Sequence, residues 1–154
     1  KYVCINNYCI NNKKNLIKNT VIGILKAASK AEFKLEEVLK PNKLSLQQFN
    51  VLRILRDRKN KISNLNTIQV RMIYKMSNTS RLIDKLIDKK LVKRSPCKEN
   101  RRKVEIIITE TGLSLLSDLD GKIESAEKKI LDPLDNESQK RLRKLLNKIN
   151  LMKQ

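Results

Sequence analysis

The side chains best suited to binding chemistry in this sequence form a run of hydrogen-bond donors that ends in a cation. The run, with the lysine that follows it one helical turn later, is Ser77, Asn78, Thr79, Ser80, Arg81 and Lys85. Apolar residues between 82 and 87 recur at helical spacing, so we expect a helix over 77–90 with Ser77 as its N-cap. Such a helix could present its polar first turn to base edges and phosphates in a major groove of DNA. An ordinary amphipathic surface helix would show the same pattern.

A basic β-hairpin is expected directly after this helix. The segments 91–94 and 103–109 have the composition of strands, and Pro96 lies in the connection between them. Polar and cationic residues occupy the expected tip: Lys98, Asn100, Arg101, Arg102 and Lys103. A basic hairpin behind a recognition helix is a wing, and arginine at its tip suits the narrow minor groove. Helix and hairpin together therefore favour a DNA-reading winged helix over an ordinary surface helix.

These residues receive different expected roles. We expect Arg81 to read a base, because a guanidinium can donate two hydrogen bonds to a guanine edge. The donors at 77–80 are expected on phosphates or bases, and Arg102 in the minor groove. The expected phosphate ligands are Lys85, Lys98, Arg101 and Lys103.

The charge of the chain is large and uneven. The formal net charge of +19 divides into +5 over residues 1–42, +14 over 43–103 and 0 over 104–154. A phosphate-binding module would concentrate cations in this way. Two Phe, three Tyr and no Trp argue against single-strand binding by base stacking. The absence of His and the low count of three Gly argue against a metal site, a cofactor and an enzyme.

Helices are expected on both sides of the DNA-reading segment. The first covers 13–39 and is ended by Pro41, and the second begins at Leu44 or Ser45. The third, over 65–74, is the first helix of a helix-turn-helix. After the hairpin, a long helix begins at Thr111 or Gly112 and is ended by Pro133, and a last helix begins at about Asn136. The last helix carries an apolar seam, which needs a partner: Leu142, Leu145, Ile149 and Met152. We expect the first and last helices to form a dimer interface, with packing of the last helix on the first as the alternative.

Four stretches resemble the MarR family of winged-helix transcriptional regulators. They are LQQFNVLRIL (46–55), MSNTSRLIDKL (76–86), NRRKV (100–104) and ITETG (108–112), in the family's order. The resemblance runs from about Lys14 to the C-terminus. It implies a homodimer, a palindromic operator in double-stranded DNA and, in many members, a small aromatic or oxidant effector that releases the DNA. Asn100 stands where the family usually has an aspartate that braces the wing arginine.

The expected fold is mainly α with a small β-hairpin wing. Residues 1–12 form an N-terminal arm and 13–154 a single domain, with the winged helix at about 44–110 between dimerisation helices at about 13–40 and 111–154. Cys4, Cys9 and Cys97 are free thiols by default in a reducing compartment, and the alternative is that Cys4 and Cys9 sense oxidants, as N-terminal cysteines do in some relatives. No membrane span or secretory signal is recognisable, so we expect a cytoplasmic protein without a membrane partner.

The expected function is that of a sequence-specific transcriptional regulator. It would act as a repressor dimer on double-stranded DNA and be released by a small-molecule or oxidant signal. The alternative is a non-specific architectural DNA- or RNA-binding protein, which would bind with a steep salt dependence and no operator preference.

Overall fold

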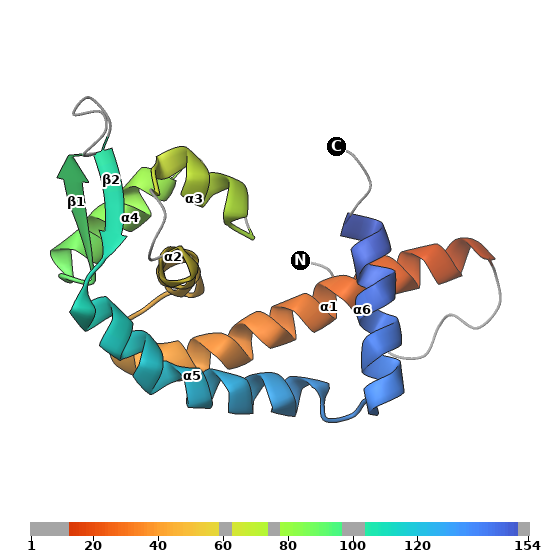
Figure 1. Ribbon diagram of the computed structural model, residues 1–154. Coiled ribbons are helices and arrows are strands. Elements are labelled where there is room, and N and C mark those ends of the chain that lie inside the picture. The colour runs from red at the N-terminus through yellow and green to blue at the C-terminus, as the bar shows by residue number, and fades with distance from the viewer. Residues whose placement is uncertain (1–12, 59–62, 74–77, 97–103, 151–154) are drawn as a thin grey trace.

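The computed structural model describes residues 13–58, 63–73, 78–96 and 104–150. Its elements in chain order are α1 (Lys13–Leu39), the 3₁₀ turn η1 (Lys40–Asn42), α2 (Leu46–Asp57), α3 (Leu65–Arg71), α4 (Thr79–Asp88), β1 (Val92–Pro96), β2 (Val104–Ile108), α5 (Glu110–Leu131) and α6 (Asn136–Asn150). The long helices α1 and α5 pack along each other, and α2, α3, α4 and the hairpin gather where α1 ends and α5 begins (Figure 1). The expected fold class, mainly helical with one β-hairpin, is confirmed.

Polar side chains fix the starts of three helices. Ser45 and Gln48 form a capping box on α2, in which each side chain accepts the other residue's backbone N–H at 3.2 Å. Asn64 and Thr109 cap α3 and α5 by accepting the N–H three residues on, at 2.9 and 3.1 Å. These caps place the helix starts at or within two residues of the sequence-based expectation.

The helix α4 begins two residues later than the sequence pattern indicates. It spans Thr79–Asp88, and Asn78 occupies the N-cap position without a side-chain cap hydrogen bond. The assignment of Ser77 as N-cap was therefore wrong, and Ser77 itself lies outside the described residues. Apolar periodicity determines which face of a helix is buried but not its first residue, which explains the error.

Two helical segments end in the same backbone arrangement, with a lysine in the left-handed region. Lys43 follows η1 with φ 53°, and Lys90 follows α4 with φ 59°. The next N–H in each case donates to the carbonyl five residues earlier, at 3.3 Å for Leu44 and 3.0 Å for Leu91. This is the Schellman arrangement, which usually places glycine at the left-handed position. Both leucines then enter the core.

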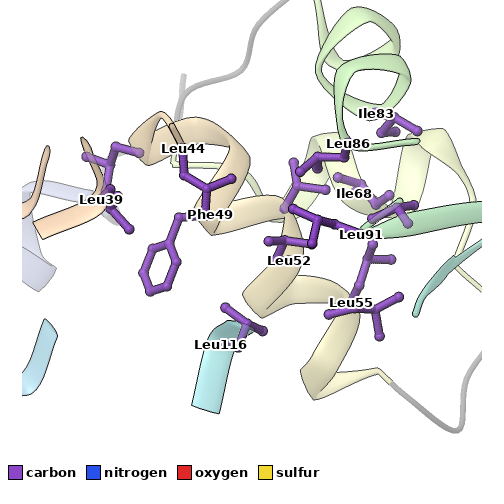
Figure 2. Packing of buried hydrophobic residues seen from close by; sticks show 14 of the residues in the cluster. Leu39, Leu44, Phe49, Leu52, Leu55, Ile68, Ile83, Leu86, Leu91 and Leu116 are labelled. Atoms are coloured by element: carbon purple, nitrogen blue, oxygen red, sulfur yellow. The ribbon is translucent and has the colours of Figure 1, made fainter. Parts of the chain in front are cut away.

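One hydrophobic core joins the winged helix, residues 46–108, to the two long helices. Side chains that are 0% exposed come from five different helices and include Leu39, Leu52, Ile68, Ile83, Leu86 and Leu116. Figure 2 shows these side chains converging around α2, together with Phe49 and Leu91. Because Ile83 and Leu86 belong to this core, α4 cannot turn about its own axis without exposing them.

The hairpin pairs in antiparallel register, from Val92 opposite Ile108 to Pro96 opposite Val104. The N–H of Ile106 also donates to the carbonyl of Ser63 at 2.7 Å, which ties β2 to the segment before α3. Strand side chains alternate between faces, so Val92 is buried while its neighbour Lys93 is exposed. The tip, 97–103, lies outside the described residues.

Several apolar side chains remain exposed to solvent on each of the helices α1 and α6. The first half of α1 exposes between 37% and 73% of Leu16, Ile17, Val21, Ile24 and Leu25. The helix α6 exposes between 36% and 51% of Leu142, Leu145, Leu146 and Ile149, and none of its residues is buried. The alternative that α6 buries its seam on α1 is therefore not what the described part of the chain adopts.

Candidate nucleic-acid interface

The helix α4 presents a polar face opposite its buried one. Its exposed residues are Ser80, Arg81, Asp84, Lys85 and Asp88, as the apolar spacing predicted. Asn78, at the N-cap position, is exposed as well. Three donor side chains therefore lie at the surface around the first turn, where the helix dipole also favours an anion.

Thr79 does not belong to this surface. Its side chain is 0% exposed, so it cannot reach DNA, and the role predicted for it was wrong. Thr79 precedes Ile83 by four residues and therefore lies on the same, buried face of α4. The prediction treated residues 77–80 as one run of polar donors and did not extend the apolar face of the helix back from Ile83 to Thr79.

An ion pair ties the hairpin to α4. Arg94 Nη2 on β1 donates to Asp84 Oδ1 at 2.6 Å, and both side chains are about half exposed. The pair offsets the negative charge of Asp84, which would otherwise repel phosphate from the exposed face of α4. Sequence reasoning placed Arg94 only in a strand. The pairing depends on the angle between hairpin and helix, for which no sequence signal exists.

The helix α3 adds an exposed cation. From the sequence, Gln69, Arg71 and Lys75 are expected to face outward and to contact the DNA backbone. Arg71, in the last turn of α3, is exposed, whereas Gln69 is only partly exposed. Lys75, the third residue expected there, lies outside the described residues.

The other predicted site residues also lie outside the described residues. They are Ser77 before α4; Lys98, Asn100, Arg101, Arg102 and Lys103 at the hairpin tip; and Cys4 and Cys9. Their roles remain predictions. Among the described residues no group of three or more His, Cys, Asp or Glu side chains could hold a metal ion.

The end of α4 contacts the connection between α1 and α2. Lys89 Nζ donates to the carbonyl of Lys43 and, at 3.2 Å, to Gln48 Oε1. Burial lowers the pKa of Lys89 below its ordinary value, and the charges of Lys85 and Lys43 lower it further. This contact links the end of the recognition helix to the turn before α2 and to the first turn of α2, and it was not predicted from the sequence.

A hollow of about 930 Å³ opens beside this contact. Its walls come from the end of α1, the start of α2 and the second half of α4, and they include Phe33, Lys40, Gln48, Leu82, Lys85 and Lys89. Apolar and cationic groups therefore face the same space next to the recognition helix, together with the carboxylates of Glu36, Glu37 and Asp88.

The arrangement defines a class of protein. The helices α3 and α4 form a helix-turn-helix, the second helix has an exposed polar face, and an antiparallel hairpin follows it. This is a winged-helix DNA-binding unit. None of the helices in the described ranges is long and apolar enough to cross a bilayer.

Comparison with known proteins specifies the family. The model of the MarR family matches residues 44–104. The transcriptional regulator PecS of Dickeya dadantii is 33% identical over 132 residues, which cover 84% of this chain and 79% of PecS. The chain belongs to the MarR family of transcription regulators, which are DNA-binding proteins and not enzymes.

Solved structures show the same fold at lower identity. A C80S mutant of Escherichia coli MarR, complexed with operator DNA, superimposes with a TM-score of 0.79 at 21% identity, covering 90% of this chain and 99% of that one. The DNA binding of BpsR of Bordetella bronchiseptica is regulated by 6-hydroxynicotinic acid. BpsR superimposes with a TM-score of 0.76 at 20% identity, and the match covers 96% of this chain and 100% of BpsR.

Proposed function

We propose that this protein is a homodimeric repressor that binds a palindromic operator through α4. The observation that carries the proposal is the exposed face of α4, where Ser80, Arg81 and Lys85 are held outward because the opposite face is part of the core. The net charge of +14 in residues 43–103 supports the proposal that this surface binds the phosphates of DNA. Two such helices in a dimer would enter successive major grooves about one helical turn apart.

Different residues of α4 would have different roles in DNA binding. Arg81 would read a base edge, Asn78 and Ser80 would donate to phosphates or bases, and Lys85 would bind phosphate. The wing tip would follow the minor groove with Arg102, flanked by Lys98, Asn100, Arg101 and Lys103. Arg94, paired with Asp84, would hold the base of the wing against α4.

The exposed apolar faces support the dimer. The first half of α1 and one face of α6 leave nine apolar side chains more than a third exposed, namely Leu16, Ile17, Val21, Ile24, Leu25, Leu142, Leu145, Leu146 and Ile149. Contiguous apolar surface of this kind marks interaction sites. A second copy of the chain would cover both helices.

The hollow beside Lys89 supports release of DNA by a small ligand. Phe33 and Leu82 offer apolar surface. Four cations, Lys40, Lys43, Lys85 and Lys89, outnumber the three carboxylates, Glu36, Glu37 and Asp88, so the chemistry fits a small aromatic carboxylate. An anion there would relieve the unfavourable environment that lowers the pKa of Lys89. The regulation of BpsR by 6-hydroxynicotinic acid supports this ligand class. Titration with aromatic carboxylates should release bound DNA in the wild type and fail in Lys89→Met.

The experiment that tests the proposal is selection of binding sites from a random-sequence duplex library by the purified protein. Affinity for the selected duplexes should be followed against salt concentration. We expect an inverted repeat with half-sites about ten base pairs apart. Tight, salt-sensitive binding without an enriched motif would contradict the proposal and favour the non-specific architectural alternative.

A further inference from the structure

An ion pair joins the winged helix to the long helix α5. Arg56, in the last turn of α2, donates from Nη1 to Asp120 Oδ2 at 2.8 Å and from Nη2 to Asp120 Oδ1 at 3.0 Å. A bidentate (two-pronged) ion pair of this kind fixes the relative orientation of the two side chains as well as the distance between them. The hydrogen bond from Asp120 raises the pKa of Arg56 above its ordinary value, although burial acts in the opposite sense.

The pair lies where the winged helix meets the rest of the molecule. Just before Asp120, the helix α5 buries Leu116 and Leu119 in the core around α2, and beyond Asp120 it continues to Leu131. Three other ion pairs in the described part of the chain are internal to one helix or to the winged helix: Lys34–Glu37, Glu124–Lys128 and Asp84–Arg94. None of these three would oppose a rotation of the winged helix on α5, whereas the Arg56–Asp120 pair would have to break.

We propose that Arg56 and Asp120 are positioning residues that set the orientation of the winged helix on α5 and, with it, the distance between the two recognition helices of a dimer. This inference rests on the proposed dimeric function. Hydrophobic burial between α2 and α5 is non-directional and tolerates small rotations, whereas the two-pronged contact does not. One base pair corresponds to about 3.4 Å along the DNA axis, so a small rotation changes the half-site spacing that fits.

The test compares operators of different spacing. Duplexes that carry the two selected half-sites at the selected spacing, and at one base pair more or less, are titrated with the wild type and with Asp120→Asn. The wild type should prefer one spacing. The variant should reduce that preference about three- to tenfold, because each dimer loses two pairs. Glu124→Gln is the matched control, since it removes the same charge one turn further along α5 from a pair that stays within that helix.

A reversed pair distinguishes positioning from a loss of structure. Arg56→Asp combined with Asp120→Arg restores an ion pair and should recover most of the spacing preference. The side chains are 30% and 50% exposed, and pairs of this exposure contribute little to folding. The urea midpoint of unfolding should therefore stay close to that of the wild type in Asp120→Asn.

Two results would overturn the inference. The first is an Asp120→Asn protein that keeps the wild-type spacing preference. The second is a loss of preference in Asp120→Asn that the reversed pair does not restore, or that Glu124→Gln shares. A wild type without any spacing preference would instead contradict the proposed dimer, and the inference would fall with it.

Discussion

Arg81 is an exposed guanidinium in the first turn of α4, on the face opposite Ile83 and Leu86. Because a guanidinium can bond one base edge in two places, Arg81→Ala should cost about 1–3 kcal/mol on the operator and relax preference at one position of each half-site. Competition binding against single-base operator variants measures both effects.

Lys85→Ala provides the contrast to this prediction. It should weaken binding to all sequences alike and flatten the salt dependence, because it removes a phosphate contact. If Arg81→Ala weakened operator and scrambled DNA equally, the assignment of base reading to Arg81 would be wrong.

Lys90 carries backbone strain at the end of α4. Its φ of 59° lies in the left-handed region, where a Cβ atom is unfavourable and glycine is usual. Lys90→Gly should therefore raise the free energy of unfolding by about 1 kcal/mol, measured as a higher urea midpoint at an unchanged slope. Lys90→Ala keeps the Cβ and should show no such gain. A lower midpoint in the glycine variant would contradict this reading of the turn.

At the scale of elements, most helix boundaries were predictable because local sequence features indicate them. The bounds of α1 match the expected 13–39, since apolar spacing and Pro41 define it, and Asn136 begins α6 as expected. Contacts between elements were not predictable from spacing. The pairs Asp84–Arg94 and Arg56–Asp120 join residues 10 and 64 positions apart, and only the packing angles of the helices and hairpin bring them together.

Two glycines in α5 should respond oppositely to alanine. A Cβ at Gly112 would lie 2.4 Å from the carbonyl oxygen of Leu91 and 2.8 Å from Ile108 Cγ1, whereas a Cβ at Gly121 would meet nothing within 4 Å. Gly112→Ala should lower the free energy of unfolding by about 1–3 kcal/mol through overpacking. Gly121→Ala should raise it by about 0.5–1 kcal/mol, because alanine favours a helix interior.

Chemical denaturation of the two variants decides this prediction. Equal effects of the two substitutions would show that the approach of α5 to the end of α4 is not as close as described.

At the scale of the whole molecule, we propose that a second copy of the chain covers the exposed apolar faces of α1 and α6. Leu145 is 51% exposed on α6, and Leu145→Glu would place a charge in the proposed interface twice per dimer. We expect the dimer dissociation constant to rise more than about tenfold, since each buried leucine contributes about 1.5–3 kcal/mol. Sedimentation equilibrium measures it.

Asn147→Glu is the matched control for the dimer prediction. It adds the same charge to an exposed position of α6 that lies away from the apolar face, so it should leave the dimer intact. Dimers of equal strength in both variants would place the interface elsewhere.

The most direct test of DNA reading by a dimer is protection of guanine N7 from methylation on the selected operator. The N7 atom lies in the major groove, where α4 is proposed to bind. We predict two clusters of protected guanines about one helical turn apart, related by the symmetry of the operator and lost together in Leu145→Glu. Protection that is absent from the major groove, or scattered without symmetry, would contradict a dimer that reads DNA through α4.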